Sequence, residues 1–383
     1  MNRIERWYTR TAIGLLNFLV LFVFLNVALA MVFHFMPRPV VDEAGTFNHM
    51  RGLDQHKFIV PTAFTGVSPT DLDEVLTDFN QWCQMGFPYV PWVGYGVHPF
   101  HSRLFNVSPL PQDDDTCERL VPGIAAGEGR KLTVYCLGGS TCLGWDLADA
   151  WTLPACLQEA LQAAVPSDTR VEVHNLGQPG YYSSQEVALL LHLLRAGHRP
   201  DVVVFLDGFN DCWETVTTGD VPGFTGQLRS LAMGAQHPHF DLTPYQWLPM
   251  IDLALRLHRA PPPPDPSFLS PEAIVSTYEA NVQVAGAACR ACGVAPVFFW
   301  QPVNFSHNHV KAHQLPLTGI PFLATVRAAY EKVEGFPHVV CLGSELDKYP
   351  SDQPIFIDLS HYNPAFNRYL AQRMLPYILA ARP

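Results

Sequence analysis

The sequence has few basic residues. Among its 383 residues, 24 Lys and Arg stand against 35 Asp and Glu, which gives a formal net charge of -11 at pH 7. Binding to a phosphate backbone depends on clustered positive charge, and this chain has no basic run. We therefore expect no nucleic-acid partner.

Charge is missing altogether from residues 11–36, which contain no Asp, Glu, Lys or Arg. At a rise of about 1.5 Å per residue, a helix of this length can cross the ~30 Å hydrocarbon core of a bilayer. The short segment before it is basic, with Arg3, Arg6 and Arg10. Because basic flanks stay in the cytoplasm, residues 1–10 are predicted to be cytoplasmic and the chain after about residue 37 to be exoplasmic.

A cleaved signal peptide is the alternative for this segment. The small residues "ALA" at 28–30 fit a cleavage site. However, the apolar run continues beyond them through "MVFHFM", which is long for a signal-peptide core. We predict an uncleaved transmembrane signal-anchor helix, and both alternatives place the main domain outside the cytoplasm.

Metal-binding and redox motifs are sparse. The nine cysteines include one CxxC, Cys289 and Cys292, which is predicted to close a helix. A thioredoxin-type CxxC instead opens a helix, where the positive end of the dipole lowers a thiol pKa. These two cysteines are therefore expected to be buried small residues or a structural bridge. His307, His309 and His313 have no carboxylate at ligand spacing, so neither a metal nor another cofactor is expected.

The chain changes character near residue 130. Residues 37–130 show weak periodicity and are predicted to be an irregular extension, containing one short helix, that packs on the main domain. Residues 131–383 alternate strand and helix patterns, which predicts a three-layer α/β/α domain with about five parallel strands. An insertion at about 212–270 interrupts this domain. The predicted strands are 131–138, 170–177, 201–208, 295–302 and 338–343.

The glycine-rich stretch "LGGSTCLG", residues 137–144, links the strand at 131–138 to the next helix. A phosphate-binding P-loop would need Lys and Ser/Thr after Gly144, but Trp145 and Asp146 stand there. A dinucleotide-binding turn would need glycine where Ser140 stands. Nucleotide binding is therefore disfavoured.

A nucleophilic role fits the same stretch better. Ser140 lies in a tight strand-to-helix turn, and a serine needs a base and a residue that orients the base. His361 and Asp358 can supply both, in the known chain order Ser, Asp, His. Acyl transfer also needs donors for the oxyanion, and the N–H groups of Ser140 and Gly180 and the Asn210 amide are candidates.

Together these blocks resemble the SGNH/GDSL hydrolase superfamily of esterases and acyltransferases. Four separated blocks carry the resemblance: "GGST" with Ser140, "NLGQPGYYSS" with Gly180, "DGFND" with Asn210 and "DLSH" with Asp358 and His361. It covers about residues 131–383 and implies a flavodoxin-like sheet, a Ser140–His361–Asp358 triad and an oxyanion hole of Ser140, Gly180 and Asn210.

One residue departs from the commonest form of the first block. The family usually has Gly-Asp-Ser, whereas Gly139 precedes the serine here. "GGST" looks like a variation found in membrane-anchored or exported bacterial members. The resemblance thus implies a bacterial inner-membrane protein whose catalytic domain faces the periplasm.

The expected activity is a serine esterase that acts on short-chain, acetyl esters of a carbohydrate or another small substrate. Tyr181, Phe209 and Trp300 are candidates for lining the substrate cleft. An O-acyltransferase that modifies an extracytoplasmic glycan would use the same site. A non-catalytic binding protein and a thiol-redox protein are the alternatives from other classes.

Overall fold

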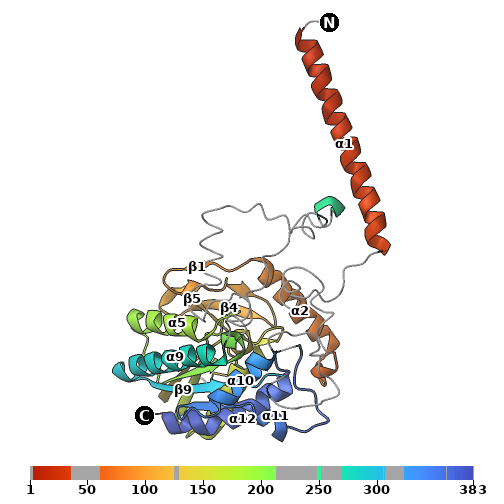
Figure 1. Cartoon of the computed structure of the whole chain (residues 1–383). Coiled ribbons are helices and arrows are strands. Elements are labelled where there is room, and N and C mark those ends of the chain that lie inside the picture. The colour runs from red at the N-terminus through yellow and green to blue at the C-terminus, as the bar shows by residue number, and fades with distance from the viewer. Residues whose placement is uncertain are drawn as a thin grey trace. The chain divides into compact units, whose positions relative to one another are not determined.

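The computed structural model describes residues 3–35, 61–124, 129–212, 248–251, 253, 270–304, 306, 323–358 and 360–382 (Figure 1). Two units divide the chain, one of Met1–Leu53 with Ser230–Pro263 and the other of Asp54–Arg229 with Pro264–Pro383. Most of the predicted 212–270 insertion, and the three histidines weighed as metal ligands, lie outside the described residues.

The N-terminal unit contains the long helix α1, Arg3–Phe35 (Figure 1). Within it, Glu5–Val32 has a mean hydropathy of 2.6 and is apolar and long enough to cross a membrane. Its large apolar side chains are exposed: Phe18 is 63% and Phe24 is 67% exposed. An exposed apolar helix of this length is typical of a membrane span, as the sequence predicts.

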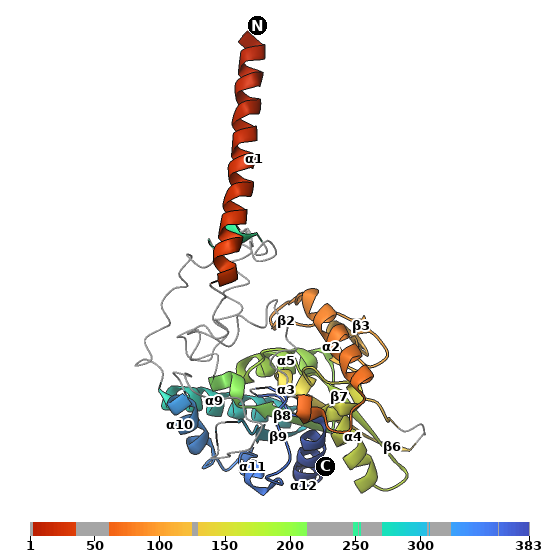
Figure 2. The ribbon, with the colours of Figure 1, turned by 90° about the vertical axis from the view of Figure 1, so that its right-hand side faces the viewer.

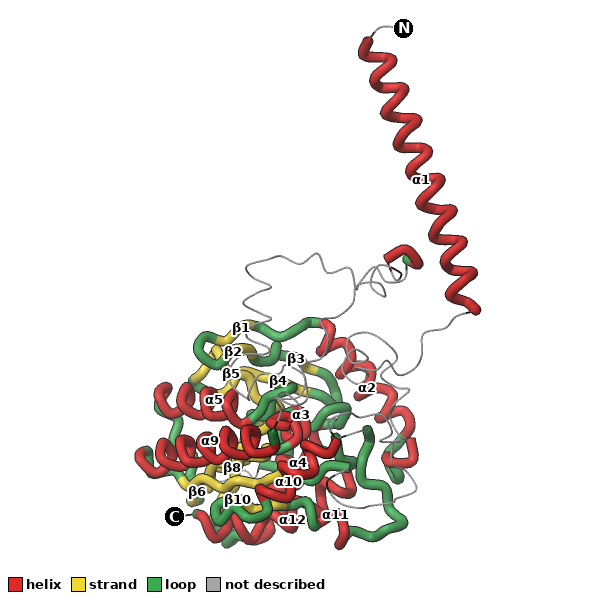
Figure 3. The backbone as a smooth tube through the Cα atoms, viewed as in Figure 1, coloured by secondary structure: helices red, strands yellow, loops and turns green. Residues whose placement is uncertain are grey.

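The larger unit is built on one mixed sheet with the strand order β10-β9-β8-β6-β7-β5-β4-β3. Its five core strands are parallel, and their order corresponds to 2-1-3-4-5 along the chain, the flavodoxin-like arrangement. Figure 3 shows these strands between the helices. The predicted fold class is therefore confirmed. The parallel strands are β6 Arg130–Gly138, β7 Thr169–Asn175, β8 Val202–Asp207, β9 Ala295–Trp300 and β10 Val339–Cys341.

Continuous apolar runs explain why the parallel strands lie in the middle of the fold. All six residues of β8 are buried, since both faces of a parallel sheet are covered by helices. The two apolar cores lie on opposite faces of the sheet. One packs against α5 (Ser183–Ala196), α9 (Pro271–Ala291) and α10 (Leu323–Val333), and the other against α4 (Leu153–Ala164) and α12 (Pro364–Ala381). Figures 1 and 2 show α5 and α9 across the strands from α12.

Helix ends follow the sequence signals at most positions. Ser270 caps α9 by accepting a hydrogen bond from Ala273 N at 3.1 Å, and Gly197 ends α5 with a φ of 97°. The start of α5 has no side-chain cap. Ser183 is the first helical residue and does not cap it, because its hydroxyl donates to Asp211 instead, at 2.5 Å.

The extension before residue 130 is more regular than predicted. Residues 100–119 form three antiparallel strands that continue the sheet, and β5 pairs with β7 through Arg119 and Asn175. The acidic stretch "PQDDDT", residues 111–116, lies partly in β5, where cross-strand pairing outweighs the low strand propensity of aspartate. The remaining elements here are α2 Pro69–Gln84, β1 Tyr89–Val90, β2 Gly94–Tyr95, β3 Phe100–His101, β4 Asn106–Leu110 and β5 Asp113–Arg119.

Candidate active site

The site lies at the carboxyl edge of the parallel sheet, beside the strands β6 and β8. In flavodoxin-like sheets this is the topological switch point, where ligands bind. Ser140 opens the short helix α3 (Ser140–Leu143) directly after β6, and Asn210 follows β8. The turn before α12 brings His361 to the same edge.

Ser140, His361 and Asp358 form a continuous hydrogen-bonded chain. His361 Nε2 lies 2.7 Å from Ser140 Oγ, and His361 Nδ1 lies 2.6 Å from Asp358 Oδ2. The carboxylate accepts the ring proton on Nδ1, so the lone pair on Nε2 is free to accept the serine proton. The sequence separation between base and serine is 221 residues, yet the fold places them in contact.

Asp358 is held in its ionised form. Burial favours the neutral acid, but the adjacent charge of His361 and the hydrogen bonds to the carboxylate outweigh it, so the pKa of Asp358 is lowered. The backbone N–H groups of His361 and Ser360 donate to Oδ1 at 2.8 and 2.9 Å. The tight turn thus fixes the carboxylate before it binds the imidazole.

The candidate oxyanion donors come from three loops. Gly180 has a φ of 72°, a conformation that favours glycine. Asn210 Nδ2 donates one hydrogen to Tyr181 O at 2.7 Å, which anchors the amide beside the Gly180 loop and leaves its second hydrogen for another acceptor. Ser140 N lies in the first turn of α3, where helix N–H groups have no partner within the helix.

The space around Gly139 explains its departure from the commoner aspartate. A Cβ at this position would lie 2.4 Å from Asn210 Nδ2 and 2.9 Å from Tyr181 O. Such distances are too short for any side chain. The Asn210 amide therefore occupies the volume that a residue other than glycine would need.

Sequence reasoning missed several residues next to the triad. Trp145 stacks on the ring of His361, with centroids 5.8 Å apart and planes at 17°. Asp146 is 4% exposed and has a φ of 57°. Burial and the charge of Asp358 raise the pKa of Asp146 to about 7. The only signal in the sequence was the presence of two aspartates, Asp146 and Asp149, in the apolar stretch "CLGWDLADAW".

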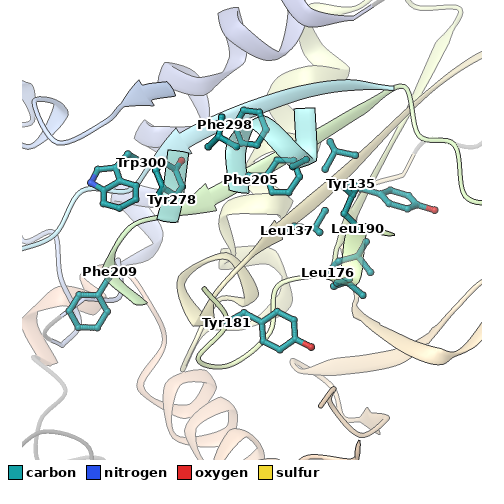
Figure 4. Packing of buried hydrophobic residues seen from close by; sticks show 14 of the residues in the cluster. Tyr135, Leu137, Leu176, Tyr181, Leu190, Phe205, Phe209, Tyr278, Phe298 and Trp300 are labelled. Carbon is teal, nitrogen blue, oxygen red and sulfur yellow. The ribbon is translucent and has the colours of Figure 1, made fainter. Parts of the chain in front are cut away.

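The predicted cleft residues lie in the core (Figure 4). Trp300 is 1% exposed and packs between Tyr278 and Tyr330, at centroid distances of 4.5 and 5.2 Å. Tyr181 is 2% exposed, and its hydroxyl donates to Tyr95 O. Phe209 is 7% exposed in the same cluster. All three side chains are buried in the same apolar cluster.

The cysteines are unpaired in the structure. Cys289 lies in the last turn of α9, as predicted, and burial raises its pKa to about 12. Cys142 and Cys212, which flank the site in sequence, also have raised pKa values because they are buried. A thiol with a raised pKa is a poor nucleophile at neutral pH.

Three carboxyl groups are buried beneath the oxyanion loops: Glu186, Asp207 and Asp211, each 1–3% exposed. Burial, together with the charges that these groups exert on one another, raises the pKa of Glu186 and Asp207 well above the ordinary value. Burial also raises the pKa of Asp211, to about 6, although Asp211 accepts hydrogen bonds from Ser183 and Gly208. Within the described part of the chain, no group of His, Cys, Asp and Glu is arranged to hold a metal ion.

Comparisons with known proteins give a likeness of fold. No family model and no curated protein matches the chain. A member of the lipolytic protein G-D-S-L family from Veillonella parvula is 11% identical with a TM-score of 0.38, over 65% of this chain and 98% of that one. A variant of an acetyl xylan esterase from Geobacillus stearothermophilus is 16% identical with a TM-score of 0.34, over 65% and 95%. At these values, the likeness alone identifies neither a reaction nor a substrate for this chain.

Proposed function

We propose that the protein is a serine esterase of the SGNH type in which Ser140 is the nucleophile. The observation that carries this proposal is the chain of hydrogen bonds from Ser140 Oγ through His361 to Asp358, at 2.7 and 2.6 Å. Only Ser140 and Asp358 at the two ends of the chain are partly exposed, while His361 is 3% exposed. A buried base between an accessible hydroxyl and an ionised carboxylate is suited to acyl transfer.

In the acylation step, His361 Nε2 takes the proton of Ser140 as the hydroxyl oxygen attacks the ester carbonyl. Asp358 keeps the imidazole in the productive tautomer and stabilises the imidazolium that forms. The negative charge on the tetrahedral intermediate is bound by the N–H groups of Ser140 and Gly180 and by the Asn210 amide. Collapse of the intermediate expels the alcohol, which takes the proton from His361.

In the deacylation step, the same base activates water against the acyl-enzyme. His361 takes a proton from water as its oxygen attacks the acyl carbon. The proton then returns to Ser140 Oγ as the carboxylic acid leaves. This cycle consumes one ester and one water and needs no cofactor.

The substrate and location belong to the same proposal. The basic residues in the first turns of α1 and the uncharged span that follows them support a single-pass anchor with the catalytic unit on the exoplasmic side. Esters that meet such a unit include the acylated carbohydrates of the cell surface. We infer that the enzyme removes short acyl groups, with acetyl preferred.

Hydrolysis of a graded ester series by the full chain in detergent tests this function. We expect release of acetate from acetyl esters to exceed release of longer acids, and Ser140→Ala to lower kcat by roughly 10³-fold or more. Ser68→Ala, at an exposed serine far from all three triad residues in sequence, is the matched control and retains activity. Turnover by Ser140→Ala at the unmodified rate would exclude this function.

A further inference from the structure

The segment that follows the nucleophile contacts the catalytic base. Its indole, Trp145, lies nearly parallel to the His361 imidazole, at 17° and 5.8 Å between ring centroids. Asp146 comes next, is 4% exposed, and interacts electrostatically with both His361 and Asp358. The catalytic base His361 therefore has the Trp145 indole against its ring and, besides Asp358, the carboxyl group of Asp146 near it.

We propose that Trp145 and Asp146 are positioning residues for His361: the indole fixes the plane of the imidazole, and the Asp146 carboxylate favours the imidazolium that forms during catalysis. This inference rests on the proposed function of Ser140 and deepens it. An aromatic face attracts a cation, so a parallel indole also stabilises the charged ring. Both effects are larger in the transition state than in the resting enzyme, where the imidazole is neutral.

The extension before residue 130 holds Trp145 in place. Phe79 of α2 packs against the indole edge to face, with centroids 4.7 Å apart and planes at 67°. The ring of Trp145 thus has His361 and Phe79 as packing partners, which leaves it little freedom to rotate.

Arg119 of β5 fixes the backbone on either side of Trp145. Its side chain is fully buried, donates to Leu143 O at 3.0 Å and Gly144 O at 2.5 Å, and also donates to Leu147 O. It is paired with Asp149 at 3.0 Å. A single guanidinium therefore holds three carbonyl groups of residues 143–147, and the turn that presents Trp145 and Asp146 is rigid.

Asp146 is surrounded by groups from three parts of the fold. Arg119 comes from β5, Cys83 from α2, and His361 and Asp358 from the loop before α12. Burial and the charge of Asp358 raise the pKa of Asp146 to about 7, while His361 and Arg119 oppose the rise. The carboxyl group is therefore neutral in acid and ionised above about pH 7.

The substitution Asp146→Asn tests the effect of the negative charge on the Asp146 carboxylate. The φ of 57° at this position is tolerated by asparagine, so the turn is preserved while the charge is removed. An ionised Asp146 stabilises the imidazolium, and a neutral one does not. The ratio of kcat/KM between the unmodified chain and Asp146→Asn is therefore expected to rise from near one in acid to about tenfold at about pH 8.

Trp145→Leu and Trp145→Phe test the stacking. We expect Trp145→Leu to lower kcat by about tenfold with little change in KM, and Trp145→Phe to recover most of the loss because a ring remains. Trp92→Phe, at a tryptophan that is 81% exposed, and Asp115→Asn, at an exposed aspartate, are the matched controls. Both controls are expected to leave the pH profile unchanged.

Nitrogen NMR of the His361 ring, measured on the full chain in detergent, separates this inference from the function itself. If the unmodified chain hydrolysed no ester, the proposed function would fail, but the ring nitrogen signals of His361 would still move in Trp145→Leu, because the stacked indole is removed. A ratio of kcat/KM between the unmodified chain and Asp146→Asn that does not depend on pH would overturn the role of Asp146. Full activity of Trp145→Leu would overturn the role of the indole.

Discussion

At the scale of single residues, the packing of the site requires glycine at position 139. The absence of a side chain there leaves room for the Asn210 amide, which is anchored on Tyr181 O at 2.7 Å. The sequence alone gives no reason for this glycine. The structure explains the glycine, because any larger residue would displace the Asn210 amide from the position of the proposed oxyanion donor.

Restoring the commoner motif is therefore expected to impair the enzyme. Gly139→Asp, and Gly139→Ala to a lesser extent, push the Asn210 amide away and should lower kcat by about 10²–10³-fold, the usual cost of losing one oxyanion donor. Steady-state ester hydrolysis checks this. Gly335→Ala, where a Cβ meets nothing closer than 3.5 Å, is the control with no loss. Full activity of Gly139→Asp would show that the amide is not needed where it stands.

Three buried carboxyl groups lie where α5 packs against the end of β8. They belong to Glu186, Asp207 and Asp211. Their pKa values are raised on folding, so the native state holds protons that the unfolded chain loses above about pH 4. For these groups the contribution to the free energy of unfolding is largest in acid and falls as pH rises. For Asp211 the fall extends to about pH 6.

Glu186→Gln removes one of these ionisable groups. Glu186 shares a hydrogen bond with Asp207, and a glutamine amide can donate to the same carboxyl group, so the substitution costs few contacts. We expect the melting temperature of the variant to exceed that of the unmodified chain at about pH 8 and to approach it at about pH 4. Glu279→Gln, on an exposed position of α9, is the control. A difference in melting temperature that stays constant with pH would contradict the burial of the charge.

At the scale of elements, the sequence pattern predicted the parallel core well and the extension poorly. A short apolar run such as "DVVVFLDG" favours a strand that is buried on both faces, and β8 is such a strand. The strands of residues 100–119 depend instead on long-range pairing and on buried ion pairs such as Arg119 with Asp149, which local propensity does not contain.

The sequence likewise predicts some residues of the candidate site and not others. Each of Ser140, Asp358 and His361 lies in a turn that the alternation of strands and helices locates, so their convergence could be predicted. The stacking of Trp145 on His361 and the packing of Phe79 behind it depend on side-chain directions across separate elements. Likewise, Trp300 looked like a cleft residue because it ends a strand, but its side chain packs in the core of the fold.

At the scale of the whole molecule, α1 is apolar and long enough to anchor the proposed enzyme in a membrane. A charged residue in the middle of a membrane span costs about 2.5–3.5 kcal/mol on insertion scales. The double substitution Leu19→Arg with Leu21→Arg is therefore expected to release the chain from membranes washed at alkaline pH, whereas Leu19→Ala with Leu21→Ala keeps it there. Retention of the arginine variant in the membrane pellet would contradict anchoring through α1.

The central claim is tested most directly by identifying the residue of the full chain with which a fluorophosphonate reacts. The probe forms a covalent bond only with an activated nucleophile, and peptide mass mapping locates it. We predict one adduct on Ser140, absent in Ser140→Ala and formed much more slowly in His361→Ala. A folded chain that forms no adduct, or one whose adduct lies on another residue, would contradict the assignment of Ser140 as the nucleophile.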